Sequence, residues 1–545
     1  MSRSIQIFLI FLFYWIPDIC YAQSWFWIGF ADKTGTLYSI SKPEEFLSER
    51  AIQRRIRQNI PIDETDLPVS KFYIDSIINS GAYLVNTSKW LNGITVKSEN
   101  DSLAETWRRY EFVTEVKLSK PNKQNIKKAF TKFGEASNQT IIDTSLYGAS
   151  VHQVSQLNGH YFHQKGIKGQ GMVIAVLDAG FYKANKLPSL SNLYETGKIL
   201  GTRDFVNPGS DIYTEHPHGM MVLSTMGGNL PGELIGTAPE ASYWLLRTED
   251  AASEYLIEED NWVAGAEFAD SVGADVINSS LGYYEFDDST MNHTYADMDG
   301  KTTRVTQGAN MAASKGILVF SSAGNEARTN WRKIIAPADG DHVIAVGAVD
   351  RNRNYASFSS VGPAADGAIK PDLAAMGSGT AVQGTLGDIV ARNGTSFASP
   401  VLAGMTACLW QANPTVSAKE IARVMMLAGH QANNPDTLLG YGIPDLHLAD
   451  IIMNQFNVPV AESPKAWKVF PNPFQSTLTI FSNSGYKGEV GLEVNSLAGV
   501  SILKSKINSD GYIRTTQFSQ LPAGIYLVKI SGDSFSETHK ILKIR

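Results

Sequence analysis

Four short, largely apolar runs in the middle of the chain constrain its fold more than any other feature. They cover residues 172–177, 274–277, 317–320 and 343–346, and helical segments rich in small residues lie between them. A strand that is apolar along its whole length is typical of a parallel sheet with both faces covered. The alternation of such strands with helices predicts an α/β sandwich with a mostly parallel sheet, over about 142–455.

The region before this sandwich has a different pattern. It contains an arginine-rich helical stretch at 48–57, a second helical stretch at 101–110, and β-like runs at 83–85, 94–96 and 113–118. This mixture predicts a small α+β unit within residues 23–141. Its end, from Pro121 to Ile141, is polar and lysine-rich, which favours a linker.

The region after the sandwich changes to strict alternation of apolar and polar residues. The alternating runs are 478–480, 492–494, 525–530 and 541–544, with turn residues between them. This pattern predicts a small antiparallel β-sandwich over 468–545. Residues 453–467 show no periodicity and contain Asn, Pro and Ser, so we expect a linker that couples the two units only weakly.

Composition excludes several classes of protein. The chain has 545 residues, of which 43% are hydrophobic, so it is neither disordered nor short of core material. Its net charge of −7 gives no basic excess, so we expect no nucleic-acid partner. The two cysteines, Cys20 and Cys408, cannot build a disulfide framework or a cysteine zinc site. Cys408 lies in an apolar helical stretch, where a small core residue is expected.

The first residues have the pattern of an export signal. Arg3 precedes a ten-residue apolar run at 7–16, and Ala22 offers a small residue for cleavage before Gln23. Such a run is too short to span a bilayer, and no later segment is apolar enough, so we expect no transmembrane span. The alternative for residues 1–22 is a buried N-terminal helix or strand. The neighbours of Cys20 do not fit a lipid anchor.

Three polar residues stand at the ends of apolar segments, where the packing of a hydrophobic core does not require a polar side chain. Asp178 directly follows the strand-like run 172–177, and His218 opens an apolar helical segment. Ser396 precedes another apolar helical segment, and Pro400 fits the first turn of that helix. Each residue alone has an ordinary explanation, as a turn residue, a structural histidine or a helix N-cap. Together, in the order Asp, His, Ser and in glycine-flanked turns, they match one known order of a Ser-His-Asp triad.

The motifs around these residues resemble the subtilisin family of serine proteases. Further family motifs follow in the expected order at 236–241 (GTAPEA), 276–282 (VINSSLG), 322–326 (SAGNE), 343–348 (VIAVGA), 357–363 (SFSSVGP) and 370–373 (KPDL). The resemblance implies a subtilisin-like three-layer sandwich that hydrolyses peptide bonds through an acyl-enzyme. Ser396 would be the nucleophile, His218 the base and Asp178 its orienting carboxylate. Asn325 would donate to the oxyanion, together with the backbone N–H of Ser396.

The resemblance also implies how a polypeptide substrate binds. Ser280, Leu281 and Gly282 match the segment that pairs with an extended peptide, and Gly282 would let the substrate backbone approach. The chemistry needs no cofactor. Structural calcium stays open, but no residue pattern indicates it. His160 and His163 are spaced like a metal pair, although packing on a helix surface explains them more simply.

Three positions depart from the family pattern without removing a catalytic group. Ala179 stands where a hydroxyl residue usually follows the aspartate, Met220 replaces a threonine, and Met376 replaces a proline. These departures affect the expected rate and specificity, not the reaction.

The flanking regions acquire roles from the same resemblance. Residues 23–141 have the position of a propeptide that chaperones folding and blocks the cleft as an intramolecular inhibitor, with cleavage expected within about 125–146. Residues 469–474 (VFPNPF), 521–528 (LPAGIYLV) and the basic terminal strand resemble the sorting domain of type IX secretion. A carbohydrate-binding or generic β-module is the alternative for 468–545.

The sequence therefore predicts a secreted or surface serine endopeptidase that passes through the periplasm. Its expected partners are polypeptide substrates, its own propeptide and the type IX secretion machinery. The alternative is a catalytically inactive subtilisin-like binding protein.

Truncation near residue 460 tests the sorting role. No predicted catalytic residue lies beyond Ser396, so the truncated protein should fold and hydrolyse peptides. In the native host it should accumulate in the periplasm, whereas the full chain appears outside the cell. Fractionation followed by a peptidase assay measures both, and normal export of the truncated form would contradict the sorting role.

Overall fold

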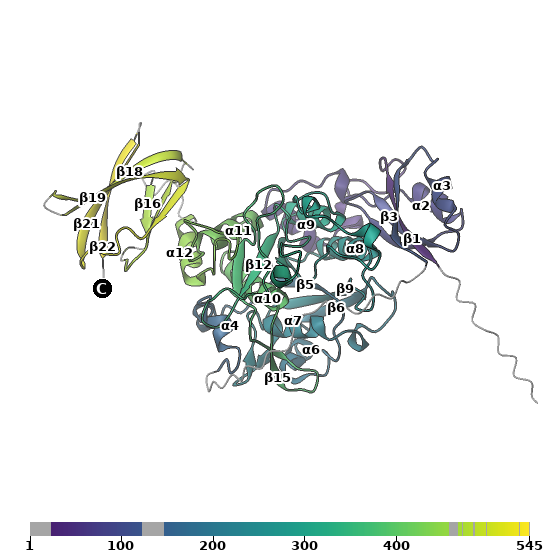
Figure 1. Cartoon of the computed structure of the whole chain (residues 1–545), viewed down its shortest axis with the longest axis horizontal. Coiled ribbons are helices and arrows are strands. Elements are labelled where there is room, and N and C mark those ends of the chain that lie inside the picture. The colour runs from purple at the N-terminus through teal and green to yellow at the C-terminus, as the bar shows by residue number, and fades with distance from the viewer. Residues whose placement is uncertain are drawn as a thin grey trace, which may run out of the picture.

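The computed structural model describes residues 23–122, 146–456 and 467–543, apart from 471, 473, 483–485, 497–498 and 533–534. The predicted signal segment and most of the lysine-rich linker lie outside the described residues. Three bodies follow one another along the chain (Figure 1), here called the N-terminal unit, the central unit and the C-terminal sandwich. None of the helices in the described ranges has the length and hydrophobicity that a bilayer crossing demands.

A seven-stranded sheet forms the middle layer of the central unit. Its strands have the order β13-β12-β11-β10-β5-β9-β6, and every described pairing between them is parallel. The strands are β5 (Val173–Asp178), β6 (Ile199–Asp204), β9 (Ser242–Arg247), β10 (Val276–Ser279), β11 (Leu318–Ser322), β12 (Ile344–Val349) and β13 (Leu373–Met376). The four predicted apolar runs correspond to β5, β10, β11 and β12, at the centre of the sheet.

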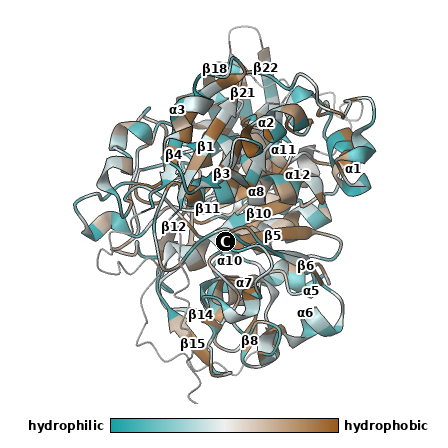
Figure 2. Cartoon of the chain, turned by 90° about the vertical axis from the view of Figure 1, so that its right-hand side faces the viewer, coloured by the Kyte–Doolittle hydropathy of each residue, from teal (hydrophilic) through white to brown (hydrophobic). Residues whose placement is uncertain are grey.

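Helices cover both faces of this sheet. On one face Ile174 and Val176 of β5 share a core with α7 (His218–Gly227) and α10 (Thr395–Ala412). On the other face Ala175 and Leu177 pack with α8 (Ile257–Ser271) and α9 (Arg304–Ser314). Successive residues of a strand point to opposite faces, so a buried strand must be apolar throughout. Figure 2 shows this as hydrophobic colouring of the interior strands β5 and β10. The predicted three-layer α/β fold is confirmed.

The other elements of the central unit complete its rim. They are α4 (Val151–Ser155), α5 (His160–Gln164), α6 (Ser191–Glu195), β7 (Asn229–Leu230), β8 (Leu234–Ile235), β14 (Thr380–Gln383), β15 (Ile389–Arg392), α11 (Ala418–Leu427) and α12 (Leu446–Phe456).

The N-terminal unit is a four-stranded antiparallel sheet of order β2-β3-β1-β4 with its own small core. Its elements are β1 (Ser24–Phe30), α1 (Glu49–Arg57), α2 (Lys71–Ile78), β2 (Tyr83–Ser88), β3 (Gly93–Ser98), α3 (Leu103–Trp107) and β4 (Val113–Lys120). The predicted α+β unit is confirmed. Strand β1, whose sequence is almost continuously apolar, was not predicted.

Polar groups on α8 hold this unit against the central unit. The Glu267 carboxylate accepts hydrogen bonds from Ser88 Oγ at 2.6 Å, Lys89 N at 2.8 Å and Trp90 N at 3.0 Å. The Arg54 guanidinium, fully buried, lies 2.5 Å from Asp270. The arginines of the predicted helix at 48–57 are thus partly interface residues. A buried charge must be paired, so this docking is specific.

The C-terminal sandwich consists of two antiparallel sheets around a separate core, as predicted. The first has the order β16-β17-β20 and the second β19-β18-β21-β22. The strands are β16 (Trp467–Phe470), β17 (Leu478–Ser482), β18 (Lys487–Ser496), β19 (Ser501–Asp510), β20 (Tyr512–Thr515), β21 (Gly524–Gly532) and β22 (Phe535–Lys543).

The predicted linker and loose attachment of this sandwich need correction. Helix α12 continues to Phe456, so the connection begins after the predicted residue 453. Phe470 joins the core of the central unit, and the Arg514 guanidinium donates to the carbonyl of Gly429. Removal of the sandwich would expose these contacts, so the truncated protein should melt at a lower temperature than the full chain.

The structure speaks against the metal alternative for His160 and His163, and it places His163 in the interior and not on a helix surface. The His163 ring is 8% exposed, with Nε2 3.1 Å from the carbonyl of Thr237 and Nδ1 3.1 Å from Tyr147 Oη. Because a carbonyl only accepts, Nε2 carries the proton and Nδ1 accepts from the tyrosine. Both nitrogens of this buried ring have partners, which leaves none for a metal.

His163 should make stability depend on pH. Burial lowers the pKa of His163 from 6.5 to about 4, so between these values the unfolded chain binds a proton that the folded protein excludes. The free energy of unfolding should fall as pH drops through this window, by up to about 1.4 kcal/mol per pH unit from this group. Urea unfolding of wild type and His163→Gln at pH 7 and pH 5 measures it. A difference between the proteins that does not change with pH would contradict the assignment.

Candidate active site

The predicted site residues converge at one edge of the central sheet. Asp178 is the last residue of β5, Asn325 follows β11, and Ser280 directly follows β10. These three strands are neighbours and parallel, so their carboxyl ends lie at the same edge, where sites of α/β proteins form. His218 begins α7 and Ser396 stands in the first turn of α10.

Asp178 and His218 form a buried pair. His218 Nδ1 lies 2.7 Å from Asp178 Oδ1, and the side chains are 2% and 0% exposed, respectively. The N–H of Ala179 also donates to Asp178 Oδ1, at 2.8 Å. A carboxylate oxygen accepts, so Nδ1 carries the hydrogen of this bond and the lone pair of the neutral ring lies on Nε2. The arrangement gives the imidazole one atom that can take up a proton.

Glycines make this close approach possible. A Cβ on Gly219 would lie 2.5 Å from the carbonyl oxygen of Gly180 and 2.7 Å from the Cβ of Asp178. Gly180 has φ of +149°, and a Cβ there would lie 2.5 Å from the N of His216. The glycine-flanked turns of the sequence are therefore a steric requirement of bringing the aspartate and histidine together.

Ser396 and Ser280 exchange two hydrogen bonds. Ser396 Oγ donates to the carbonyl of Ser280 at 3.2 Å, and Ser280 Oγ donates to the carbonyl of Ser396 at 2.8 Å. Pro400 explains the second bond. Pro400 was predicted to lie in the first turn of α10, but it lies further inside the helix. It has no N–H that could donate to the carbonyl of Ser396, four residues earlier. The Ser280 hydroxyl supplies the missing donor and fixes the start of α10 beside β10.

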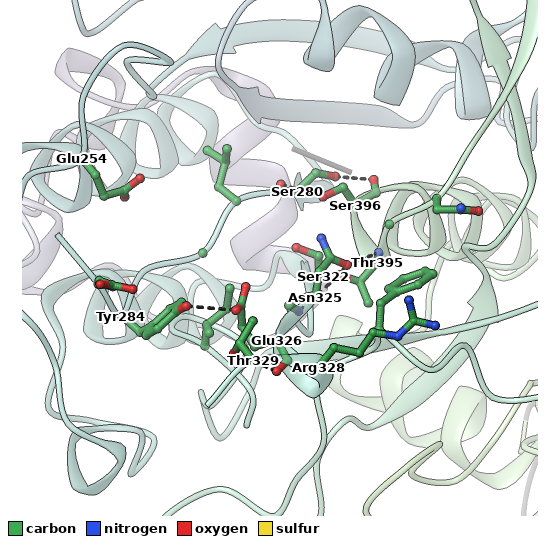
Figure 3. Close-up of a pocket in the computed structure, with 18 of the residues that line it drawn as sticks. Glu254, Ser280, Tyr284, Ser322, Asn325, Glu326, Arg328, Thr329, Thr395 and Ser396 are labelled. Atoms are coloured by element: carbon green, nitrogen blue, oxygen red, sulfur yellow. Dashed lines mark hydrogen bonds between the residues drawn. The ribbon is translucent and has the colours of Figure 1, made fainter. Parts of the chain in front are cut away.

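Asn325 is oriented by the residue before Ser396. Its Oδ1 accepts from the Thr395 N–H at 2.9 Å and from Thr395 Oγ1 at 3.0 Å. A backbone N–H can only donate, so the amide oxygen must face Thr395 and the Nδ2 donor points elsewhere. Asn325 and Ser396 both line one cleft, and Figure 3 shows them on the same side of it. An amide donor and a helix N-terminus can together stabilise a negatively charged oxygen there.

The cleft has a volume of about 1030 Å³. Ser280, Leu281 and Gly282 line it, as does Ser396. Within the described chain, the backbone N–H and C=O groups of Leu281 and Gly282 form no hydrogen bond with other backbone. An extended peptide could therefore add to this segment as a strand.

The structure adds a second reason for a glycine at 282. A Cβ at this position would lie 2.3 Å from Ile335 Cδ1. The packing of Ile335 thus disfavours a side chain there, and the predicted approach of a substrate backbone stays a prediction.

The sequence analysis missed two supporting residues. Thr395 holds Asn325, as described above. Asn278, fully buried in β10, accepts from Ser399 Oγ at 2.8 Å through Oδ1 and donates to Ser280 Oγ at 3.2 Å through Nδ2. Asn278 thus ties β10 to α10. Asn278 stands inside the quoted motif 276–282, and Thr395 directly precedes Ser396; a buried asparagine within an apolar strand was the available signal for Asn278.

One group of carboxylates within the described residues is close enough to hold a metal ion. The ligand atoms of Glu249, Glu254 and Glu258 lie within 4.8 Å of one another. The sequence analysis named none of them, because they come from a loop and from the start of α8. Cys408 needs no metal: it is fully buried, its Sγ is 3.3 Å from the Thr237 carbonyl, and burial raises the pKa of its thiol.

Three family models match successive parts of the chain. Residues 169–442 match the subtilase family, residues 25–133 match the peptidase S8 propeptide domain of Bacteroidota, and residues 468–544 match the secretion system C-terminal sorting domain. These ranges lie within the central unit, the N-terminal unit with its following linker, and the C-terminal sandwich.

Individual proteins match the central unit. Subtilisin DY of Bacillus licheniformis is 31% identical over 262 residues, which are 47% of this chain and 83% of that protein. Subtilisin NAT of Bacillus subtilis subsp. natto is 32% identical over 276 residues, 49% of this chain and 63% of that protein. The crystal structure of MycP1 from Mycobacterium smegmatis matches with a TM-score of 0.44 and 21% identity, over 58% of this chain and 87% of that one.

Ala179 offers a test of the buried pair. Asp178 Oδ2 is buried and has no hydrogen-bond partner among the described residues, and the methyl group of Ala179 cannot donate. In Ala179→Ser the hydroxyl should donate to this oxygen and raise the melting temperature, because an unsatisfied buried acceptor costs about 1–3 kcal/mol. Ala179→Gly, which adds no donor, is the matched control. Calorimetry should place Ala179→Ser above both other proteins, and a melting temperature below the glycine variant would contradict the prediction.

Proposed function

Because the chain belongs to the subtilase family, we propose that Ser396, His218 and Asp178 are the catalytic residues of this secreted serine endopeptidase. The observation that carries the proposal is the buried Asp178–His218 hydrogen bond, formed at the sheet edge where Ser396 lies in the first turn of α10. The ring of His218 packs against that of Phe397, the neighbour of Ser396, with centroids 5.7 Å apart. The imidazole therefore lies beside the turn that carries the hydroxyl.

The reaction proceeds in two halves. In the first, Ser396 Oγ attacks the scissile carbonyl while its proton passes to His218 Nε2, and the ring then gives this proton to the leaving amine. In the second, water attacks the acyl-enzyme by the same route, and its proton returns through the ring to Ser396 Oγ. Asp178 stays ionised, orients the ring through Nδ1 and stabilises its positive charge in both halves.

The charge that develops on the carbonyl oxygen needs donors in place before the reaction. Asn325 Nδ2 and the Ser396 N–H supply them, and the two bonds from Thr395 keep the Asn325 amide from rotating. Ser280, Leu281 and Gly282 bind the substrate backbone as an added strand. No step requires a cofactor.

The N-terminal unit acts as the intramolecular inhibitor of this site until it is removed. The match to the S8 propeptide domain and the docking of Ser88 and Lys89 on Glu267 support this role. The sorting domain directs the enzyme to the cell surface or the medium through the type IX system.

The competing function is that of an inactive binding protein on the same fold. A binding protein would not need the Asp178–His218 pair, nor an Asn325 amide held by two hydrogen bonds. The presence of both beside Ser396 therefore favours catalysis.

Replacement of the nucleophile tests the proposal. Ser396→Ala should lower kcat for peptide hydrolysis by about 10⁶-fold and leave the N-terminal unit covalently attached. It should also abolish labelling by a fluorophosphonate probe, which reacts with activated serines. Ser314→Ala, at an exposed serine of α9, is the matched control and should behave like wild type. Autonomous maturation and casein cleavage by Ser396→Ala would refute the assignment, and a wild type that no probe labels would favour the binding protein.

A further inference from the structure

The cleft beside Ser396 is strongly acidic at its opposite end. Six carboxylate residues line the cleft against a single cation, Arg328; they are Glu249, Glu254, Glu285, Asp287, Glu326 and Asp350. Figure 3 shows Glu254 and Tyr284 at one end, far from Thr395 and Ser396 at the other. We call the part formed by Glu249, Glu254 and Asp287 the acidic end. Any residue of a substrate that lies there meets negative charge.

Two carboxylates of the acidic end, Glu249 and Glu254, lie close to each other and to Glu258. Atoms of Glu249, Glu254 and Glu258 lie within 4.8 Å of one another, and Glu249 and Glu258 are 2% and 0% exposed. Tyr283 Oη donates to Glu249 Oε2 at 2.9 Å. Like charges this close repel each other strongly where water is excluded, and a cation brought between them offsets that repulsion. Glu254, which is partly exposed, is the member that reaches the open cleft.

The loops that carry these groups fix each other. The N–H of Glu254 donates to Asp287 Oδ2 at 3.1 Å, and the N–H of Asp287 donates to the carbonyl of Glu254 at 2.9 Å. The two loops thus form one wall, and their carboxylates occupy set positions. A preorganised group binds a charged ligand at a lower entropic cost than a mobile one.

A lysine from another part of the chain already occupies the approach to this wall. Lys120 ends β4 of the N-terminal unit, and its ammonium lies 3.2 Å from Ser253 Oγ, 3.7 Å from Asp250 Oδ2 and 5.3 Å from the ring centroid of Tyr255. Ser253 lines the cleft. The lysine side chain is only 13% exposed. The loop next to Glu254 therefore accepts a cationic side chain in the structure itself.

The position of Lys120 also gives the direction of the cleft. Lys120 lies N-terminal to the predicted cleavage region at about 125–146, so we infer that the acidic end faces residues N-terminal to the bond that is cut. The sequence that follows it, from 121 to 128, contains three more lysines. The chain thus pairs a basic segment that runs into its own predicted cleavage region with an acidic cleft.

We propose that the acidic end binds a lysine or arginine side chain of the substrate, N-terminal to the scissile bond, and makes the protease selective for basic segments. This inference rests on the proposed function, because it assumes cleavage at Ser396. A divalent cation held by the same carboxylates is the competing occupant, and the experiment distinguishes the two.

The test uses the mature enzyme and fluorogenic peptides that differ at one position. Lysine, norleucine or glutamate is placed in turn at each of about five positions before the cleaved bond. At one position lysine should exceed norleucine by about tenfold in kcat/KM, with glutamate lowest. The ratio should shrink as salt rises from 0.05 M to about 1 M, because ions screen a partly exposed charge pair.

Charge variants assign the effect to the acidic end. Glu254→Gln should lower the ratio of lysine to norleucine kcat/KM, and Glu254→Lys should reverse the preference toward glutamate. Glu240→Gln, which changes the same charge outside the cleft, should leave the ratio as in wild type. A structural role alone would change all peptides equally and leave their ratio constant.

The outcomes separate this inference from the proposed function. If the wild-type enzyme cleaves all peptides but shows no lysine preference at any position, the inference is wrong and the proposed function stands. If it cleaves none of them and no serine probe labels it, the proposed function is wrong. Saturable calcium binding that Glu254→Gln abolishes, with no change in peptide preference, would assign the acidic end to a metal. The wild-type preference and its salt dependence decide the question even if a variant does not fold.

Discussion

The hydrogen bond between Asp178 and His218 depends on a geometry that the whole central unit provides. A carboxylate and an imidazole excluded from water are costly to bury unless each satisfies the other. The sheet places the Asp178 carboxylate at the end of β5, and α7 places the His218 imidazole at its first residue. Gly180 and Gly219 let the two backbones approach to a distance that any side chain would prevent. The apolar layers on both faces of the sheet then hold this arrangement in place.

Most of the fold followed from the sequence, because the central strands are buried on both faces and therefore apolar throughout. The strands nearer the edges, β6 and β9, were missed since their burial is mixed. The triad candidates followed from residue type and order. Their supporting contacts did not, because the pairing of Ser280 with Ser396 joins residues that are distant in the chain. Likewise, the clash of a side chain at 282 with Ile335 could be seen only in the structure.

The N-terminal unit and the central unit contact each other through buried charge pairs as well as through apolar packing of Trp90. Arg54 and Arg55 of α1 both reach Asp270, to which Lys89 also donates. These pairs hold the pKa of the Asp270 carboxyl well below its usual range despite full burial. A buried pair is strongly destabilised when one partner leaves, so separation of the units is costly until water can replace the lost partners. Such an interface keeps the N-terminal unit docked on the folded central unit.

At the cleft, too, negative charge on the central unit meets positive charge on the N-terminal unit. The central unit presents Asp270 on α8, where Arg54, Arg55 and Lys89 of the N-terminal unit dock, and it presents carboxylates beside the cleft, where Lys120 lies. Lys120 contacts Ser253, which lines the cleft, and Asp250, which does not. Its ammonium therefore lies next to the acidic end that we propose for substrate choice, but its carboxylate partner is a separate group. A change of charge at Asp250 should alter the docking of Lys120, whereas a change at the acidic end should alter substrate choice.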